Sequence, residues 1–132
     1  MKSEEWKEVR LGDVAENIFS GGTPSTTNPE FWNNEFNWLS SGETRNRYIT
    51  TTDKKITQKA VENSSTRLAR INDVVIASAG QGFTRGQVSF CNINTYINQS
   101  LISVRSDIKK INPRYLFFNL QNRYQELRQI RS

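Results

Sequence analysis

The chain has 132 residues and contains no histidine. The commonest general base and the commonest metal ligand of proteins are therefore missing, which removes most hydrolytic triads. The single cysteine, Cys91, has no partner for an intrachain disulfide, and without histidine it is too little for a zinc site. We expect no catalytic residue, no metal and no cofactor. Because the one cysteine is unpaired, we expect the protein in a reducing compartment, the cytoplasm.

Long hydrophobic runs are also missing. No apolar stretch approaches the roughly 20 residues that span a bilayer, and residues 1–5 lack the apolar segment of a signal peptide. We therefore expect no membrane partner. Apolar residues make up only 35% of the chain, but 3 Trp, 4 Tyr and 7 Phe supply enough aromatic surface for the core of one domain.

Charged residues are unevenly distributed along the chain. Residues 1–43 hold three Lys or Arg against eight Asp or Glu, whereas residues 44–132 hold fifteen against five. Arginine, which makes bidentate contacts to phosphate and to guanine, outnumbers lysine by eleven to seven. This distribution favours a polyanionic partner, although an inert basic surface would have the same composition.

A glycine-rich stretch stands between two predicted strands. Residues 74–77 form a short apolar run typical of a strand buried on both faces, and residues 87–90 alternate as a returning strand does. The three glycines within residues 80–86 leave the backbone free to approach another molecule closely. The pattern predicts a hairpin whose tip presents Gln81, Thr84 and Arg85.

Chain breakers and caps divide the rest of the chain into short elements. Residues 20–29 are rich in Gly, Pro, Ser and Thr and predict a loop, whereas the segment from Asp13 begins like a helix. Thr57 is a candidate N-cap for a helix over 57–63. Further elements are expected as strands at 6–11, 36–39, 56–57 and 96–104 and as one helical turn at 29–32.

The last segment, residues 113–132, has helical periodicity to the chain end. Asn112 and Pro113 are typical of an N-cap and a first helical position. Five large side chains then recur at steps of three and four, and no C-cap follows them. Such a stripe either covers its own domain or forms a partner interface of coiled-coil type. This C-terminal stripe consists of Leu116, Leu120, Tyr124, Leu127 and Ile130.

Short motifs spread over the whole chain carry a family resemblance. The first third contains Leu11-Gly12-Asp13, Gly21-Gly22-Thr23-Pro24-Ser25, Asn28-Pro29-Glu30-Phe31-Trp32 and Trp38. Later come Gly80-Gln81-Gly82, Thr84-Arg85-Gly86, Asn98-Gln99 and Pro113 with Tyr115-Leu116. Together these motifs resemble the target recognition domain of the specificity (S) subunit of type I restriction-modification systems.

The resemblance implies an α+β (mixed α/β) fold with a small twisted, mostly antiparallel sheet and short helices. Residues 1–112 would form the recognition domain, and residues 113–132 the start of a long, coiled-coil-type conserved-region helix. The implied function is sequence-specific binding of double-stranded DNA without catalysis, which directs methylation (M) and restriction (R) subunits to a split site. One domain would read half of that site, so the second half of an S subunit, or a second copy in a homodimer, is a further expected partner.

Candidate DNA contacts lie in the basic part of the chain and in the Ser- and Thr-rich loop. Arg85 can bridge O6 and N7 of guanine, although a tight hairpin with a solvated Arg85 has the same sequence. We expect the arginines to converge on one concave face that includes residues 80–86. The candidates at the hairpin tip are Gln81, Thr84 and Arg85. Further candidates are Arg45, Arg47, Tyr48, Lys54, Lys55 and Lys59, for which an ordinary charged loop is the alternative. Ser25 and Thr26 are the last candidates, and turn formation explains them equally well.

Two other classes of function fit parts of the sequence. One is a fragment of a DNA-modifying enzyme, because Asn28-Pro29-Glu30-Phe31 is similar to the Asn-Pro-Pro-Tyr type motif of amino-methyltransferases. The second proline and an upstream glycine-rich cofactor loop are missing, however. The other is a protein-interaction module whose basic surface meets an acidic protein.

Overall fold

The computed structural model describes residues 11–79 and 84–128. Short strands alternate with short helices in this part of the chain, in keeping with its many chain-breaking residues. The helices are α2 (Leu11–Val14), α3 (Gln58–Glu62), α4 (Pro113–Gln121) and α5 (Tyr124–Leu127), with the 3₁₀ helices η1 (Pro29–Phe31) and η2 (Ser41–Arg45). The strands are β1 (Ala15–Ser20), β2 (Phe36–Leu39), β3 (Tyr48–Ile49), β4 (Lys54–Ile56), β5 (Arg67–Ala69), β6 (Val74–Ala77), β7 (Val88–Cys91), β8 (Thr95–Ile97) and β9 (Leu101–Ser106).

The strands form two sheets within the described residues. The first sheet has five strands in the order β1-β9-β6-β7-β3, and its neighbours are antiparallel except for the parallel pair β3 and β7. The second has four strands in the order β4-β2-β8-β5, with β2 and β8 as its parallel pair. The predicted α+β class is confirmed, although two sheets stand where we expected one.

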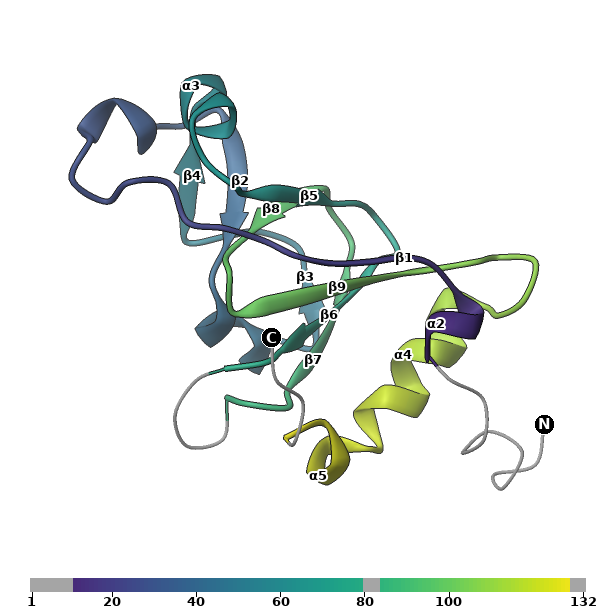
Figure 1. Ribbon diagram of the computed structural model, residues 1–132. Coiled ribbons are helices and arrows are strands. Elements are labelled where there is room, and N and C mark those ends of the chain that lie inside the picture. The colour runs from purple at the N-terminus through teal and green to yellow at the C-terminus, as the bar shows by residue number, and fades with distance from the viewer. Residues whose placement is uncertain (1–10, 80–83, 129–132) are drawn as a thin grey trace.

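Helices and sheets stack in four layers around three apolar clusters (Figure 1). The largest cluster joins α4 and α5 to one face of the first sheet and contains Phe90 and Phe117. A second cluster, with Leu39 and Val75, fills the space between the two sheets. A small third cluster around Trp38 joins the second sheet to α3 and η1. The three clusters are therefore each enclosed between two layers.

Strand β6 confirms the prediction of a strand buried on both faces. All four of its residues are buried. Val74 and Ile76 belong to the cluster under α4, whereas Val75 and Ala77 belong to the cluster between the sheets. This division follows from the alternation of side chains along a strand. Because β7 returns antiparallel to β6, the predicted hairpin is also confirmed.

Two predicted helix caps are also confirmed. The side chain of Thr57 accepts a hydrogen bond from the backbone N–H of Ala60 at the start of α3. The side chain of Asn112 accepts from the N–H groups of Arg114 and Tyr115 at the start of α4. Both caps satisfy N–H groups that have no partner within the first turn of a helix.

The beginning of the described chain differs from the prediction. We expected a helix from Asp13 onward, but Ala15–Ser20 form β1, and Asp13 lies inside the short helix α2 and does not cap it. Strand β1 pairs with β9, which is about 85 residues away in sequence, and this pairing buries Phe19. Tertiary pairing therefore overrides the local helix signal. Of the strand predicted over 6–11, only Leu11 lies within the described residues, and it begins α2.

The C-terminal segment is broken into two helices, so the prediction of one continuous helix from residue 113 is wrong for the described residues. Helix α4 ends at Gln121, and the separate turn α5 spans Tyr124–Leu127. No helix in residues 11–79 and 84–128 is long and apolar enough to cross a membrane. The division of the chain at residue 112 stays a prediction.

Candidate nucleic-acid interface

Two of the predicted segments meet at one hollow because β3 runs parallel to β7. Tyr48 pairs with Phe90 in this register, which places the residues before β3 beside the residues before β7. The hollow has a volume of about 390 Å³, and we call it the arginine hollow. Its lining residues are Thr44, Arg45, Arg47, Gly86, Gln87, Val88, Gln121 and Tyr124.

A buried carboxylate holds η2 beside the arginine hollow. Oε2 of Glu43 accepts hydrogen bonds from the backbone N–H and the hydroxyl of Ser40, at 2.8 and 3.0 Å. Oε1 of the same carboxylate accepts from the N–H of Asp53 at 2.9 Å. Glu43 is only 4% exposed, so these bonds satisfy a charge that burial would otherwise penalise. The fixed helix ends with Arg45, whose Nη1 donates to the carbonyl of Gly42 at 2.8 Å.

Arg47 connects the hollow to α4. Its Nε and Nη2 donate to Oε1 of Gln121, at 3.2 and 2.8 Å, although the two residues are 74 positions apart. Its guanidinium also lies over the ring of Phe118, at 5.8 Å from the ring centroid. Both Arg45 and Arg47 are exposed, so the hollow presents two cations to solvent.

The turn that leads into β7 packs against α5. Gly86 has a φ of 93° and donates its N–H to the carbonyl of Ala77 at 2.8 Å. A Cβ at Gly86 would lie 2.7 Å from Cγ of Arg128 and 2.9 Å from the carbonyl oxygen of Tyr124, so glycine permits this contact. Nη1 of Arg128 donates to the carbonyl oxygen of Arg85 at 2.9 Å. The turn is thus held to the C-terminal helices.

Thr84 and Arg85 are half-buried at the base of the predicted hairpin tip. The Nε of Arg85 is buried and has no hydrogen-bond partner in the described part of the chain. An unpaired buried donor is unfavourable, so Arg85 is not simply a solvated cation. Gln81, the third predicted reader of this tip, lies outside the described residues.

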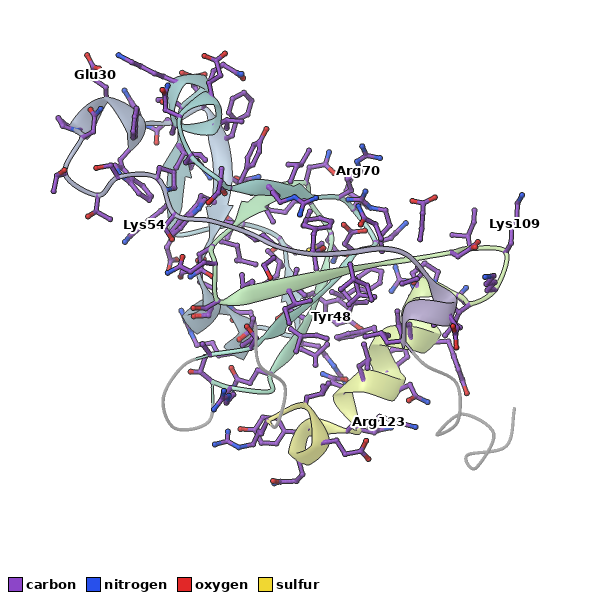
Figure 2. All side chains as sticks on the ribbon, in the orientation of Figure 1. Glu30, Tyr48, Lys54, Arg70, Lys109 and Arg123 are labelled. Carbon is purple, nitrogen blue, oxygen red and sulfur yellow. The ribbon has the colours of Figure 1, made fainter. Side chains whose placement is uncertain are left out.

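Tyr48 has a different place from the one we expected. Its ring packs at 6.3 Å from the ring of Phe90 and at 5.5 Å from the ring of Phe117. Figure 2 shows it between the first sheet and α4. The half-buried ring therefore packs against the core cluster under α4, and a DNA contact by Tyr48 stays a prediction.

A second hollow joins candidates that are distant in sequence. Lys55 donates from Nζ to Oδ1 of Asn37 at 2.9 Å, and Nζ of Lys54 lies 5.7 Å from the ring centroid of Trp32. Trp32 in turn donates from Nε1 to the carbonyl of Ser25 at 2.9 Å, which ties the Ser- and Thr-rich loop to this place. The hollow has a volume of about 360 Å³, and we call it the lysine hollow. It is lined by Thr26, Trp32, Asn33, Asn34, Lys54 and Lys55.

Lys59 is paired within the protein. Its Nζ lies 2.6 Å from Oε2 of Glu30, and both side chains are exposed. The hydrogen bond and the charge of Lys59 lower the pKa of the Glu30 carboxyl. Because this carboxylate already partners it, Lys59 is a weaker candidate for phosphate contact than the lysines of the lysine hollow.

The arginines do not converge on one face, contrary to our expectation. Arg67 and Arg105 both stack on the ring of Phe19, at 4.7 and 5.5 Å from its centroid. Arg105 also forms an ion pair of 2.9 Å with the buried Asp73. These cations therefore have structural partners, and among the described arginines only those of residues 44–47 line the arginine hollow.

The C-terminal stripe packs on its own domain. Leu116, Leu120 and Leu127 are 0%, 5% and 5% exposed and belong to the cluster that covers the first sheet. Tyr124 is half-buried, and Ile130 lies outside the described residues. These three leucines therefore cover their own domain, which is the alternative drawn from the sequence, and a partner interface of the whole stripe stays a prediction.

The Gly-Gly-Thr-Pro motif has a structural position. The N–H of Gly22 donates to the carbonyl of Ile97 at 3.0 Å, and Nε1 of Trp38 donates to the carbonyl of Gly22 at 3.2 Å. A Cβ at Gly21 would overlap Ile97, and one at Gly22 would overlap Ser65. Gly21 needs glycine because the segment lies close to the backbone of β8, and Gly22 because it lies close to the residues before β5.

Groups suited to catalysis are sparse. No cluster of three or more His, Cys, Asp or Glu side chains that could hold a metal lies in residues 11–79 and 84–128. Burial, with a smaller contribution from the charge of Asp73, raises the pKa of the Cys91 thiol to about 12. The neutral thiol packs between the two sheets, where it is a core residue and not a nucleophile.

A two-sheet α+β domain that gathers cations and amide side chains at two hollows is typical of a nucleic-acid-binding module. Residues 3–131 match the protein family described as "Type I restriction modification DNA specificity domain". The chain belongs to this family. The resemblance drawn from the sequence motifs is thereby confirmed.

Individual relatives agree with the family. The chain is similar to the specificity subunit of the type I restriction enzyme EcoR124I/EcoR124II of Escherichia coli, with 36% identity over 73 residues, which are 54% of this chain and 17% of the relative. It is 28% identical over 78 residues to the MjaIX specificity subunit of Methanocaldococcus jannaschii, covering 57% of this chain and 18% of the relative. The matched segment therefore spans less than a fifth of the length of these relatives.

Solved structures confirm the fold. The HsdS subunit from Thermoanaerobacter tengcongensis has a similar structure, with a TM-score of 0.68 and 21% identity over 92% of this chain and 28% of that one. A chain in a structure of the type I R-M system, described in terms of complex assembly and conformational transition, has a TM-score of 0.65 and 21% identity over the same shares.

Proposed function

We propose that this chain is a target recognition domain that binds double-stranded DNA in a sequence-specific manner. The observation that carries the proposal is the arginine hollow, in a member of a DNA specificity family. Two exposed cations face solvent there beside amide side chains, which are the groups that proteins use to contact phosphates and base edges.

The lysine hollow supports the same proposal. Lys54 and Lys55 stand on the edge strand β4 of the second sheet, where cations can contact the sugar-phosphate backbone. Thr26 lines the same hollow, and the Ser25 backbone is tied to it. We assign base contact to the arginine hollow, with Thr84 and Arg85 beside it, and backbone contact to the lysine hollow.

The larger assembly is a proposal as well. In it the domain has no catalysis of its own and brings methylation and restriction subunits to one half of a split DNA site in the cytoplasm. The second half would be read by a further specificity domain or by a second copy of this chain. The buried leucines of the C-terminal stripe are not the surface for that contact.

Salt-titrated binding to a random pool of DNA duplexes tests the proposal. We expect weak, salt-sensitive binding and enrichment of one short sequence. Replacing Arg45 and Arg47 together by alanine should abolish the enrichment, because base contacts are lost. Lys54→Ala should weaken binding to all sequences and reduce the salt slope by about one.

Lys109→Ala is the matched control for Lys54→Ala. It removes the same charge, and Lys109 lies at the opposite end of the molecule from Lys54 (Figure 2), so we expect unchanged binding. No enrichment at low salt, with the double arginine variant indistinguishable from the wild type, would overturn the proposal. Cleavage or methyl transfer in the presence of Mg²⁺ and S-adenosylmethionine would instead favour the enzyme-fragment alternative.

A further inference from the structure

We propose that the arginine hollow is a donor-only subsite that binds a pair of hydrogen-bond acceptors on the DNA. In the major groove the O6 and N7 edge of guanine presents such a pair, and on the backbone two oxygens of one phosphate do. The inference rests on the proposed DNA binding, and it adds which kind of chemical group on the DNA this hollow binds.

The contact between Arg47 and Gln121 fixes the orientation of an amide. A guanidinium can only donate hydrogen bonds, so the atom of Gln121 that faces Nε and Nη2 of Arg47 must be the carbonyl oxygen. This oxygen accepts two bonds, and its accepting capacity is used within the protein. What Gln121 has left for a ligand is its NH₂ group, which donates.

Further donors come from the two arginines. Nη1 of Arg47 makes no hydrogen bond to a described residue, since its bonds to Gln121 use Nε and Nη2. Arg45 donates from Nη1 to the carbonyl of Gly42, and its Nε and Nη2 make no hydrogen bond in the described part of the chain. Because Arg45 is exposed and its helix is held by Glu43, these donors face a ligand in the hollow from a fixed backbone.

Acceptors around the hollow are mostly occupied by the protein itself. The backbone carbonyls of Thr44, Arg85 and Gln87 accept from Ser89, Arg128 and Ala77, at 3.3, 2.9 and 3.0 Å. None of the described residues that line the hollow carries a carboxylate. Among the side-chain acceptors of the lining, Oε1 of Gln87 accepts from the hydroxyl of Thr44 at 3.1 Å, and the hydroxyl of Tyr124 accepts from Nη1 of Arg128 at 2.7 Å. The groups left for a ligand are thus mainly donors, whereas the adenine edge, with its N6 amino group and N7, requires a donor and an acceptor.

The base most suited to such a site is guanine, because both groups of its major-groove edge accept. A phosphate suits the same donors and would add charge attraction without sequence preference. The two sources can be separated chemically. Replacing guanine by 7-deazaguanine removes one acceptor of the base, and replacing a phosphate by a methylphosphonate removes a charged oxygen of the backbone.

The experiment uses the duplex that the wild-type chain enriches. Each guanine is replaced in turn by 7-deazaguanine, and each phosphate by methylphosphonate, and binding is measured for the wild type and for Gln121→Glu. This variant keeps the size of the side chain but replaces the donating NH₂ by an accepting oxygen. Gln125→Glu, an exposed position on α5 outside the hollow, adds the same charge and is the control.

We expect 7-deazaguanine at one position to weaken binding of the wild type and of Gln125→Glu roughly tenfold. Binding of Gln121→Glu should not change with this substitution. The same pattern at one methylphosphonate would assign the hollow to a phosphate, and the donor-only character would stand. Equal sensitivity of all three proteins at every position would overturn the inference while leaving DNA binding intact. A wild type that enriches no sequence would instead remove the proposed function, and the inference with it.

Discussion

Nη1 of Arg128 donates a hydrogen bond of 2.9 Å to the carbonyl oxygen of Arg85, across 43 positions of sequence. The same nitrogen donates to the hydroxyl of Tyr124 at 2.7 Å. One guanidinium thus joins α5 to the turn before β7, which borders the arginine hollow. The shape of the proposed DNA-contacting surface therefore depends on residues of the C-terminal helices.

Arg128→Ala should loosen this turn. A hydrogen bond from a charged donor contributes about 1.5 to 3 kcal/mol, so the turn should open more often when the donor is removed. We expect amide hydrogen exchange at Gly86 and Gln87 to accelerate roughly tenfold, with little change in β9. Lys110→Ala, which removes the same charge from an exposed position, is the control. Unchanged exchange at both amides would show that the bond does not hold the turn.

Gly86→Ala should destabilise the protein. The residue has a φ of 93°, and a Cβ would meet Arg128 and Tyr124 at 2.7 and 2.9 Å. Backbone strain and overpacking together should lower the free energy of unfolding by about 3 kcal/mol, measured by urea denaturation. At Gly42 a Cβ would meet nothing within 4 Å, so Gly42→Ala should leave stability nearly unchanged. Equal losses for both variants would contradict the packing described for Gly86.

Asp73→Asn should be among the most damaging single changes. The carboxylate is 2% exposed and accepts from Nε and Nη2 of Arg105, from the hydroxyl of Ser103 and from the N–H of Arg70. Removing one partner of a buried ion pair leaves the other charge uncompensated, which costs about 3 to 5 kcal/mol.

The matched control for Asp73→Asn is Glu126→Gln. It also removes one negative charge from an ion pair, but the Glu126 carboxylate, which pairs with Arg123, is largely exposed. Surface pairs contribute less than about 1 kcal/mol. Thermal unfolding of both variants should therefore separate them clearly. A loss for Asp73→Asn as small as that for Glu126→Gln would show that the Asp73 contacts contribute little to folding.

The Cys91 thiol should resist alkylation until the protein unfolds. Burial raises its pKa to about 12 from the ordinary 9.0, so the reactive thiolate is scarce in the folded state at pH 8. Iodoacetamide labelling, followed by mass spectrometry, should be slow in buffer and fast in 6 M guanidinium. Above pH 9.0 only the unfolded chain ionises this thiol, so its contribution to folding stability falls as the pH rises toward 12. Rapid labelling in buffer would contradict this burial.

Local chemistry explains which parts of the fold the sequence predicts well. Thr57 and Asn112 are caps whose partners lie two or three residues away, and residues 74–77 carry an apolar run that needs two covered faces. In these cases the residues that determine the structure are neighbours in the chain. The glycine-rich hairpin was predictable for the same reason, since β6 and β7 pair as consecutive strands.

The elements that the sequence did not predict depend on distant partners. Strand β1 is determined by its pairing with β9, and the arginine hollow by the parallel pairing of β3 with β7 and by the contact of Arg47 with Gln121. Helical periodicity places Leu116 and Leu120 on one face of a helix, but it does not say whether that face covers the chain's own sheet or a partner. No local signal identifies Gln121 as a lining residue.

Gly21 lies close to β8 and Gly22 close to Ser65, so the Gly-Gly-Thr-Pro motif serves the scaffold and not the proposed DNA contacts. These glycines are required by the backbone of Ile97 and by Ser65, and they do not line the arginine hollow. Two proteins could therefore share the signature and differ at every position that lines the hollow. Relatedness judged from this motif identifies the scaffold, whereas the bases contacted in the proposed function have to be deduced from the residues that line the hollow.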